Sequence, residues 1–305
     1  MARYINGHSD SVYCIQFDKS RILSGSRDRT VKFWDYDHQS QTCVRTLSGH
    51  AGSVLCLQYD DTYVITGSSD ATIIVWSSQT GERIATLSAH SSPVLDIRFN
   101  KTHLVSCSKD CTVKIWSLKT FELEHNLYGH QAAVNAIHLH GSTIVSASGD
   151  NHIMMWDLHT GALLRDLEGH TRGLACVQFD GETIISGSND RTIRVWDAKT
   201  GQCTMVLEGH TNLVRTLCFD DKRIVSGSYD QTIKVWDRKS GEMLLDLKEA
   251  HSSWVFSVGL DGGKIISASQ DRKIVIWDFT SGVSNLDYLV GDADNLATPS
   301  PHTRP

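Results

Sequence analysis

The 305-residue sequence predicts an all-β protein, a seven-bladed β-propeller. Three observations predict this fold. A unit of 40 to 42 residues occurs seven times without a gap, each unit contains short β-rich segments joined by turns, and the start of the chain matches the last part of a unit. A small sheet of this length cannot bury its faces alone, so we expect the seven units to pack around a ring.

Four residue types mark each unit. A Gly-His or Ala-His pair is followed 20 residues later by Asp and 26 residues later by Trp, and a serine stands two residues before each Asp. The histidines are His8, His50, His90, His130, His170, His210 and His251. The serines are Ser26, Ser68, Ser108, Ser148, Ser188, Ser228 and Ser269; the aspartates are Asp28, Asp70, Asp110, Asp150, Asp190, Asp230 and Asp271; the tryptophans are Trp34, Trp76, Trp116, Trp156, Trp196, Trp236 and Trp277.

Each unit provides a small antiparallel sheet. Residues 213–237 read as three β-rich segments, LVRTLCF, RIVSGS and TIKVWD, separated by the turns DDK and YDQ. The variable segment before the next Gly-His supplies a fourth strand, for example residues 203–207. Four strands, a period near 40 and a Trp-Asp ending resemble WD40 repeats. Ser77 and Ser117 replace that Asp in the second and third units, after the strand, so we expect these blades to form.

The ends of the chain indicate how the ring closes. Residues 3–5 precede Gly7-His8 as residues 45–47 precede Gly49-His50, so the N-terminal strand should pair with the last blade, around Trp277, and cover its open edge. We therefore predict one propeller over residues 1–281. Residues 282–305, which hold three of the four prolines, are expected to form a disordered tail.

Composition excludes several classes of protein. With 40% hydrophobic and 21% charged residues the chain reads as a soluble globular protein, and no apolar run has the length of a signal peptide or membrane span. We expect a protein of the cytoplasm, the nucleus or both, with no membrane partner. A net charge of −6 argues against a nucleic-acid partner. The eight dispersed cysteines suit reduced thiols better than disulfides.

No catalytic or metal-binding residue is predicted. His, Ser and Asp together suggest a catalytic triad, but a nucleophile is needed once, whereas a hydrogen-bond chain from the loop to the Trp indole is needed in every blade. Histidines outside the repeat, such as His138, His140, His152 and His159, lack ligand spacing with cysteines, and Cys107 and Cys111 form an isolated C-x₃-C pair. Phosphate-loop glycines are absent too, so we expect neither an enzyme nor a small-molecule cofactor.

A ring of variable positions is the predicted binding site. In WD repeats the residues just after the Gly-His pair and the residue before the turn Asp face one mouth of the channel. The third and fifth residues after each His are Ser11/Tyr13, Ser53/Leu55, Pro93/Leu95, Ala133/Asn135, Gly173/Ala175, Leu213/Arg215 and Trp254/Phe256; the residues before each Asp are Arg27, Ser69, Lys109, Gly149, Asn189, Tyr229 and Gln270.

The ring is basic although the chain as a whole is acidic. It contains Arg27, Lys109 and Arg215, with Arg172 one position away, and no Asp or Glu. Arginine with hydroxyl and amide donors suits phosphate, so a phosphopeptide is the expected ligand. The alternative is that these basic side chains are merely solvated and bind nothing.

The same residues carry a resemblance to a subgroup of WD proteins, the beta-transducin-repeat-containing F-box proteins that select substrates for SCF ubiquitin ligases. The similar segments span all seven repeats and include GSVLCLQYDD, VSCSKD, IVSASGD, RGLAC and KRIVSGSYD. In that family the propeller mouth binds a doubly phosphorylated degron. The resemblance implies phosphate contacts by Tyr13, Arg27, Ser53, Ser69, Arg172, Gly173, Arg215 and Tyr229, and a floor formed by Lys109, Asn135, Ala175 and Leu213.

Two departures from the family qualify this hypothesis. Trp254 stands where the family pattern leads us to expect Arg, so the preferred degron should differ. The first blade begins within the first ten residues, so we expect no F-box upstream of it in this sequence. We therefore expect either the recognition half of a longer ligase subunit, joined to SCF components through a missing F-box region, or a free-standing reader. The alternative function is a general scaffold for unphosphorylated partners in a signalling or RNA-processing complex.

Overall fold

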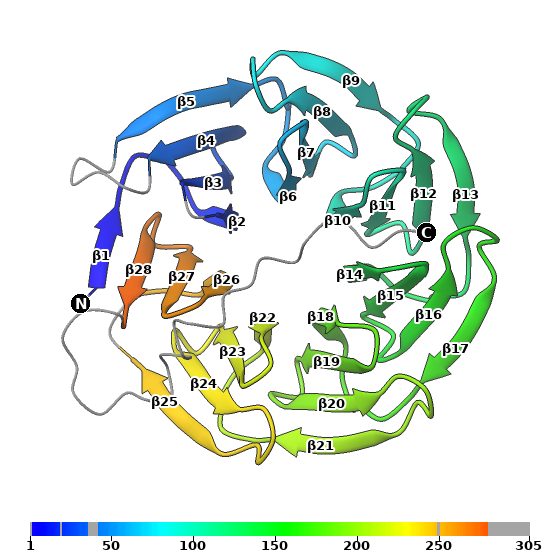
Figure 1. The fold of residues 1–305 in the computed structure, drawn as a ribbon, viewed down its shortest axis with the longest axis vertical. Coiled ribbons are helices and arrows are strands. Elements are labelled where there is room, and N and C mark those ends of the chain that lie inside the picture. Colours follow the sequence, from blue (N-terminus) through cyan, green and yellow to red (C-terminus); the bar gives the residue numbers. More distant parts are fainter. Residues whose placement is uncertain (1, 19, 36–41, 249–250, 280–305) are drawn as a thin grey trace, which may run out of the picture.

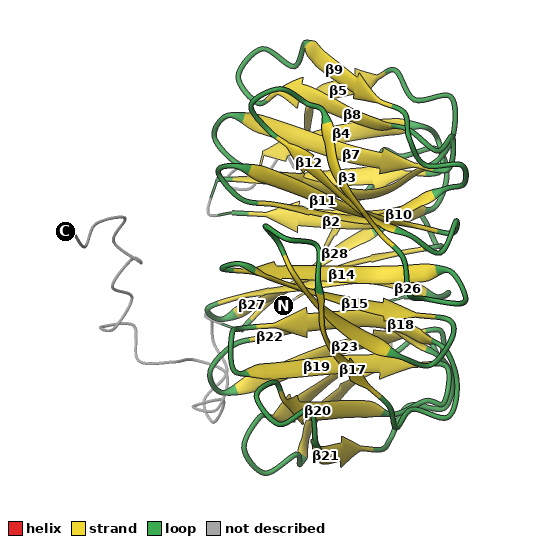
Figure 2. Ribbon diagram, turned by 90° about the vertical axis from the view of Figure 1, so that its right-hand side faces the viewer, coloured by secondary structure: helices red, strands yellow, loops and turns green. Residues whose placement is uncertain are grey.

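The computed structural model describes residues 2–18, 20–35, 42–248 and 251–279. Within these residues the chain forms 28 β-strands in seven four-stranded antiparallel sheets. The sheets stand as blades around a central axis, and the edge-on view shows loops on two opposite sides of the disc (Figures 1 and 2). The prediction of an all-β, seven-bladed propeller is therefore confirmed.

Blades 1 to 6 each use four consecutive strands, ordered from the axis outward. Blade 1 contains β2 (Val12–Phe17), β3 (Arg21–Ser26), β4 (Thr30–Asp35) and β5 (Cys43–Ser48). Blade 2 contains β6 (Val54–Tyr59), β7 (Tyr63–Ser68), β8 (Ile73–Ser77) and β9 (Arg83–Leu87). Blade 3 contains β10 (Val94–Phe99), β11 (His103–Ser108), β12 (Val113–Ser117) and β13 (Leu123–Leu127).

The second half of the ring follows the same order. Blade 4 contains β14 (Val134–His140), β15 (Thr143–Ser148), β16 (Ile153–Asp157) and β17 (Leu163–Leu167). Blade 5 contains β18 (Leu174–Phe179), β19 (Thr183–Ser188), β20 (Ile193–Asp197) and β21 (Cys203–Leu207). Blade 6 contains β22 (Val214–Phe219), β23 (Arg223–Ser228), β24 (Ile233–Asp237) and β25 (Met243–Leu247).

Blade 7 joins the two ends of the described chain. It contains β26 (Val255–Asp261), β27 (Lys264–Ser269) and β28 (Ile274–Asp278), and its outermost strand is β1 (Ala2–Ile5). β1 pairs with β28 in antiparallel register, from Ala2 opposite Trp277 to Ile5 opposite Ile274. This pairing agrees with the expected closure by the N-terminal strand and covers the outer edge of β28 (Figure 1). The tail predicted for residues 282–305 lies outside the described residues.

The core lies between the blades. Seven hydrophobic clusters each join neighbouring sheets; one packs Trp76 of blade 2 against Leu23 and Val31 of blade 1. Neighbouring blades also approach closely at glycines of the second strand. A Cβ on Gly187 of β19 would lie 2.7 Å from Val214 Cγ1 of the next blade, so a larger residue would push the two sheets apart.

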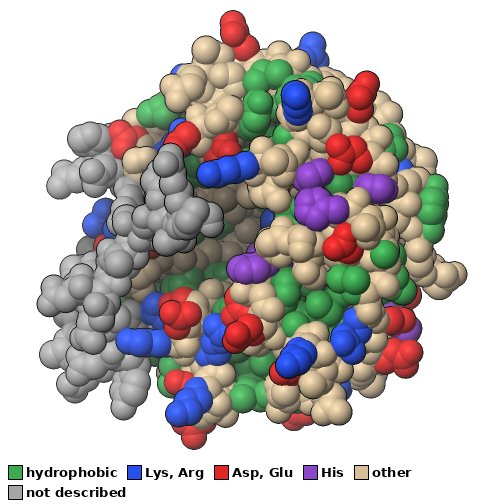
Figure 3. Space-filling view, turned by 45° about the vertical axis from the view of Figure 1, so that its right-hand side comes forward, with side chains coloured by type: hydrophobic (Ala, Val, Ile, Leu, Met, Phe, Trp, Pro, Cys, Tyr) green, Lys and Arg blue, Asp and Glu red, His purple; other side chains and the backbone are tan. Residues whose placement is uncertain are grey.

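The propeller has two distinct faces. We call the upper face the one that carries the Gly-His loops and the turns at the repeat Asp residues, and the lower face the opposite one. The space-filling view shows a hollow at the centre of the disc, with acidic, basic and histidine side chains mixed around it (Figure 3). Among the described residues no helix is long and apolar enough to cross a membrane.

Candidate functional site

A hydrogen-bond network inside each blade explains the repeated residue types. In blade 5, His170 Nδ1 lies 2.7 Å from Asp190 Oδ2, and His170 Nε2 lies 2.8 Å from Ser186 Oγ. The Trp196 indole N–H donates to the same Ser186 Oγ at 2.9 Å. With the serine O–H donating to Nε2 and the Nδ1 proton donated to the carboxylate, a neutral histidine satisfies the network.

The pKa values fit this proton arrangement. Burial lowers the pKa of His90 and outweighs its contact with Asp110. Burial would raise the pKa of Asp110, but hydrogen bonds from Thr112 and His90 outweigh it, and the pKa is lowered. The pKa of Asp70 falls to about 2 by the same balance, in which Thr72 donates the main hydrogen bonds. Blade 3 therefore holds neutral His90 beside ionised Asp110.

The structure corrects which serine belongs to this network. The sequence suggested the serine two residues before each Asp. The hydroxyl group that contacts His Nε2 belongs instead to the residue four positions before each Asp. These residues are Ser24, Thr66, Ser106, Ser146, Ser186, Ser226 and Ser267. Ser188, two residues before Asp190, instead accepts from the Asp190 backbone N–H and donates to the Arg172 carbonyl in the loop. The spacing missed this because side chains of alternate strand residues share a face.

Blade 7 departs from the other six. His251 keeps its contact with Ser267 Oγ at 2.8 Å, but the Trp277 indole nitrogen is buried without a hydrogen-bond partner among the described residues. The network therefore reaches the tryptophan in six blades. The network serines and Thr66 are fully buried, so no substrate can reach them as nucleophiles, and their role is structural.

The predicted ring of variable positions exists on the upper face. In every blade the backbone N–H of the residue before the repeat Asp donates to the carbonyl of the third residue after the repeat His. The pairs are Arg27 to Ser11, Ser69 to Ser53, Lys109 to Pro93, Gly149 to Ala133, Asn189 to Gly173, Tyr229 to Leu213 and Gln270 to Trp254. The two sets of positions are thus held side by side by the same bond in each blade.

A β-bulge places the fifth residue after each histidine. The register of every innermost strand shifts around this residue, for example between Leu174 and Cys176 in β18 and between Val214 and Thr216 in β22. A bulge re-aims the side chain of its extra residue. The bulge residues are Tyr13, Leu55, Leu95, Asn135, Ala175, Arg215 and Phe256, and they all line the central channel.

Six of the residues expected to bind peptide meet in one depression. A hollow of about 400 Å³ on the upper face is lined by Asn135, Gly173, Ala175, Leu213, Arg215 and Tyr229. Leu95, Gly149 and Asn189 complete most of its wall and were not in the implied set of contacts, although their ring positions could be read from the sequence. Arg215 donates to the Ala175 carbonyl at 3.1 Å, which ties blade 6 to blade 5 and fixes the guanidinium beside the hollow.

Several other expected residues do not line this depression. Lys109 is exposed at its turn. Ser69 Oγ accepts a hydrogen bond from the backbone N–H of Ser53 at 2.8 Å, so one lone pair of this hydroxyl is already used. Arg172 lines a separate hollow between blades 5 and 6, shared with Asn189 and Glu208.

Arg27 has an acidic neighbour that the ring positions did not reveal. Its side chain is 60% exposed, and its Nε lies 3.8 Å from Asp10 Oδ2. Asp10 is the second residue after His8, just outside the register used for the ring. The ring itself has no acidic residue, but this carboxylate reduces the positive charge next to Arg27.

Trp254 belongs to an aromatic cluster. It stacks on Tyr229, with ring centroids 4.4 Å apart and planes 8° apart. The buried Phe256 meets both rings edge-on, and Tyr13 of blade 1 lies 4.9 Å from Phe256. The Trp254 side chain remains 41% exposed. Trp254 and Phe256 are two residues apart, but Tyr229 comes from blade 6 and Tyr13 from blade 1. The packing of three neighbouring blades brings the four rings together, so spacing alone could not predict their contact.

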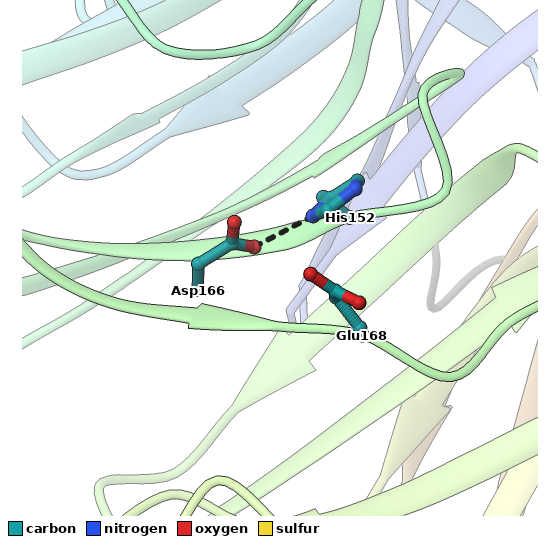
Figure 4. Close-up of side chains that lie close together, drawn as sticks. All are labelled: His152, Asp166 and Glu168. Atoms are coloured by element: carbon teal, nitrogen blue, oxygen red, sulfur yellow. Dashed lines mark hydrogen bonds and ion pairs between the residues drawn. The ribbon is translucent and has the colours of Figure 1, made fainter.

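One group of potential metal ligands lies on the rim of blade 4. His152, Asp166 and Glu168 have ligand atoms within 4.8 Å of one another, and His152 Nδ1 is 2.8 Å from Asp166 Oδ1 (Figure 4). All three are at least partly exposed, and the hydrogen bond raises the pKa of His152. An exposed ion pair explains this contact without a metal. The histidine spacing with cysteines that was considered above could not have detected these carboxylates.

The fold and the internal networks define a class of repeat protein, the WD propellers. The chain belongs to the WD domain, G-beta repeat family, whose model matches residues 2–35, 41–77, 81–117, 121–157, 161–197, 201–237 and 242–278. A solved structure is similar over most of the chain: the computationally designed Ika8 protein has a TM-score of 0.76 and 34% sequence identity, over 89% of this chain and 85% of that one.

Two curated proteins are similar over short segments. A probable E3 ubiquitin ligase complex SCF subunit, sconB, of Penicillium rubens is 44% identical over 45 residues, and F-box and WD repeat domain-containing 11-A of Danio rerio is 45% identical over 40 residues. The matches cover 15% and 13% of this chain but only 6% and 7% of those proteins. They establish a weak homology to F-box/WD proteins, in agreement with the resemblance seen in the repeats.

Proposed function

We propose that this propeller binds phosphorylated peptides at the mouth on its upper face and acts as the substrate-recognition part of an SCF-type ubiquitin ligase. Membership of the WD family supports a protein-interaction module, and the homology to F-box/WD proteins supports the link to SCF components. The observation that carries the proposal is Arg215, held beside a depression whose wall also offers the side chains of Asn135, Asn189 and Tyr229.

The chemistry of the mouth favours an anionic ligand. A guanidinium forms two parallel hydrogen bonds to phosphate, and Asn amides and a Tyr hydroxyl can donate to its remaining oxygens. Arg27, Lys109 and Arg172 stand around the same face, so two phosphates on one peptide can each meet a cation. An SCF-type reader of this kind works in the cytoplasm, the nucleus or both.

Fluorescence anisotropy with Asp-Ser-Gly-x-x-Ser peptides tests the proposal. We expect the peptide with both serines phosphorylated to bind at micromolar or lower Kd, and the unphosphorylated peptide to bind much more weakly. Arg215→Ala should reduce the affinity by about tenfold or more, because a charge-assisted hydrogen bond contributes about 1.5 to 3 kcal/mol.

The control variant is Arg83→Ala, which removes the same charge from the exposed outer strand β9. It should leave the affinity for the phosphopeptide unchanged. Equal binding of phosphorylated and unphosphorylated peptides would contradict the proposal.

The second candidate function is a general scaffold for unphosphorylated proteins. Asp10 beside Arg27 and the uncharged Trp254 favour it, because both reduce the positive character of the mouth on the side of blades 1 and 7. Partner capture that survives phosphatase treatment of the partner, but is lost in variants of the mouth, would support the scaffold instead.

A further inference from the structure

The exposed ring of Trp254 is unusual among the tryptophans of this chain. Of the seven repeat tryptophans, six are buried in the cores between blades and the seventh, Trp277, is partly buried. Trp254 lies instead on the upper face with 41% of its surface exposed, at the edge of the channel mouth. Leaving a large aromatic surface in water is unfavourable, so it is a feature to explain by what covers it.

The Trp254 indole is held in place by two aromatic neighbours. Tyr229 stacks on one face, and the buried Phe256 supports both rings edge-on. The backbones of the two residues are fixed as well: Tyr229 N–H donates to the Leu213 carbonyl, and the Trp254 carbonyl accepts from Gln270 N–H, each at 3.0 Å. A ligand that covers the indole therefore pays little ordering cost on the side of the protein.

The ring positions of blade 7 are uncharged and lie between the basic ring positions of blades 6 and 1. They are Trp254, Phe256 and Gln270. On one side lies Arg215 of blade 6, and on the other Arg27 of blade 1. A peptide that reaches from one of these arginines to the other by the shorter way crosses blade 7 and passes the indole.

We propose that the Trp254–Tyr229 pair is a subsite for an aromatic side chain of the bound peptide, next to its phosphate. This inference rests on the proposed function and specifies the ligand further. A lysine or arginine in this position would be repelled by Arg27 and Arg215, and the ring positions of blade 7 offer no cation for a second phosphate. An uncharged ring gains both burial and stacking on the indole.

The test uses labelled peptides based on Asp-pSer-Gly-x-x-pSer in which each position outside the two serines is changed in turn to Phe, Ala or Lys. Unphosphorylated versions of each peptide are measured in parallel. The proteins are the full chain, Trp254→Ala, Arg215→Ala and Tyr128→Ala. Tyr128 is 72% exposed beyond the end of β13, so Tyr128→Ala is a matched loss of an exposed aromatic elsewhere.

We expect the unaltered protein to prefer Phe over Ala by about threefold to tenfold at one or two adjacent positions, and to disfavour Lys there. Trp254→Ala should abolish the Phe preference, whereas Tyr128→Ala and Arg215→Ala should keep it. Trp254→Arg should replace it with a preference for an acidic residue. In addition, the Phe peptide should shield Trp254 fluorescence from acrylamide more strongly than the Ala peptide.

The outcomes separate the two proposals. A Phe preference that needs Trp254 but not phosphate would contradict the proposed function and leave the subsite intact. Phosphate-dependent binding with no Phe preference, or with one that Trp254→Ala leaves unchanged, would overturn the subsite alone. If no peptide of the set binds, both proposals are wrong. Equal thermal stability of Trp254→Ala and the unaltered protein confirms that the variant is folded.

Discussion

The interior networks and the ring on the upper face use neighbouring residues in opposite ways. Within each blade, His, Ser or Thr and Asp satisfy one another, and in six of the seven blades the network includes the Trp indole. The ring stands on an equally regular backbone, with one hydrogen bond and one bulge per blade, yet its side chains differ from blade to blade. Repetition therefore marks the scaffold, and variation at fixed backbone positions marks the surface available for binding.

The largest expected effect is the loss of stability in acid, which should arise from the interior networks. The pKa values of His8, His50, His90 and His130 are lowered from 6.5, mainly by burial, and those of the seven network aspartates are lowered by their hydrogen bonds, which outweigh burial. The unfolded chain thus binds more protons than the folded chain. The free energy of unfolding should fall below about pH 6.5 as the histidines titrate, and further below about pH 4 as the aspartates titrate.

Urea unfolding at a series of pH values measures this loss. His152 provides an opposing control, because its pKa is raised by its hydrogen bond to Asp166 and its contribution is lost as the pH rises. His152→Gln should therefore make the loss of stability in acid slightly steeper. A midpoint that stays constant between about pH 7.5 and about pH 5 would show that the networks do not hold neutral histidine.

The next largest effect is the difference in stability between removing an interior tryptophan and removing the one on the upper face. Trp196→Ala leaves a cavity in the core between blades 4 and 5 and should lower the free energy of unfolding by about 3 to 5 kcal/mol. Trp254→Ala, the matched change on the upper face, should cost less than about 1 kcal/mol, because its ring is only partly buried. Chemical denaturation of the two variants compares them, and similar losses would remove the distinction.

A smaller effect tests the corrected position of the network serine. Ser106→Ala leaves the Trp116 indole and His90 Nε2 without their shared partner and should cost about 1 to 3 kcal/mol. Ser106→Thr keeps the hydroxyl and should cost less, since Thr66 occupies the same place in blade 2. Ser108→Ala, which instead affects the turn, serves as comparison. No difference between the Ala and Thr variants at 106 would contradict the assignment.

The smallest expected effect concerns the charge of the mouth. Asp10→Asn removes the carboxylate near Arg27 and should strengthen phosphopeptide binding about twofold to fivefold at low salt, with little effect at high salt. Asp61→Asn makes the same change in net charge at an exposed position on the lower face. Anisotropy titrations should show no gain for Asp61→Asn; an equal gain would mean that net charge, not Arg27, controls binding.

Most of the fold could be predicted because it is periodic. The positions of His, Asp and Trp determined the number of blades, and the match between residues 3–5 and 45–47 predicted that β1 would complete blade 7. The prediction failed for individual side-chain contacts, which the repeat length does not determine. Two hydroxyl residues stand on the same strand before each repeat Asp, and only three-dimensional contacts show that Ser186, not Ser188, bridges His170 and Trp196. Nor did the sequence show that the Trp277 indole would lack a partner among the described residues.

The candidate site was predicted in its positions but not in its groupings. Register alone found Arg215, Asn135 and Tyr229. It could not show that they share a depression with Asn189, because this depends on how neighbouring blades tilt and pack. Nor could register find the stacking of Tyr229 on Trp254 or the approach of Asp10 to Arg27, since rotamers decide such contacts.

The strand that completes blade 7 affects the order of events during synthesis on the ribosome. Blades 1 to 6 can each assemble as soon as their own four strands have left the exit tunnel, but β1 emerges before all of these blades and its partner β28 emerges after them. Until then β1 remains an unpaired strand, and β28 has a bare edge when it appears. The nascent propeller is thus exposed to pairing with other strands for longest at β1, where a chaperone would protect it best.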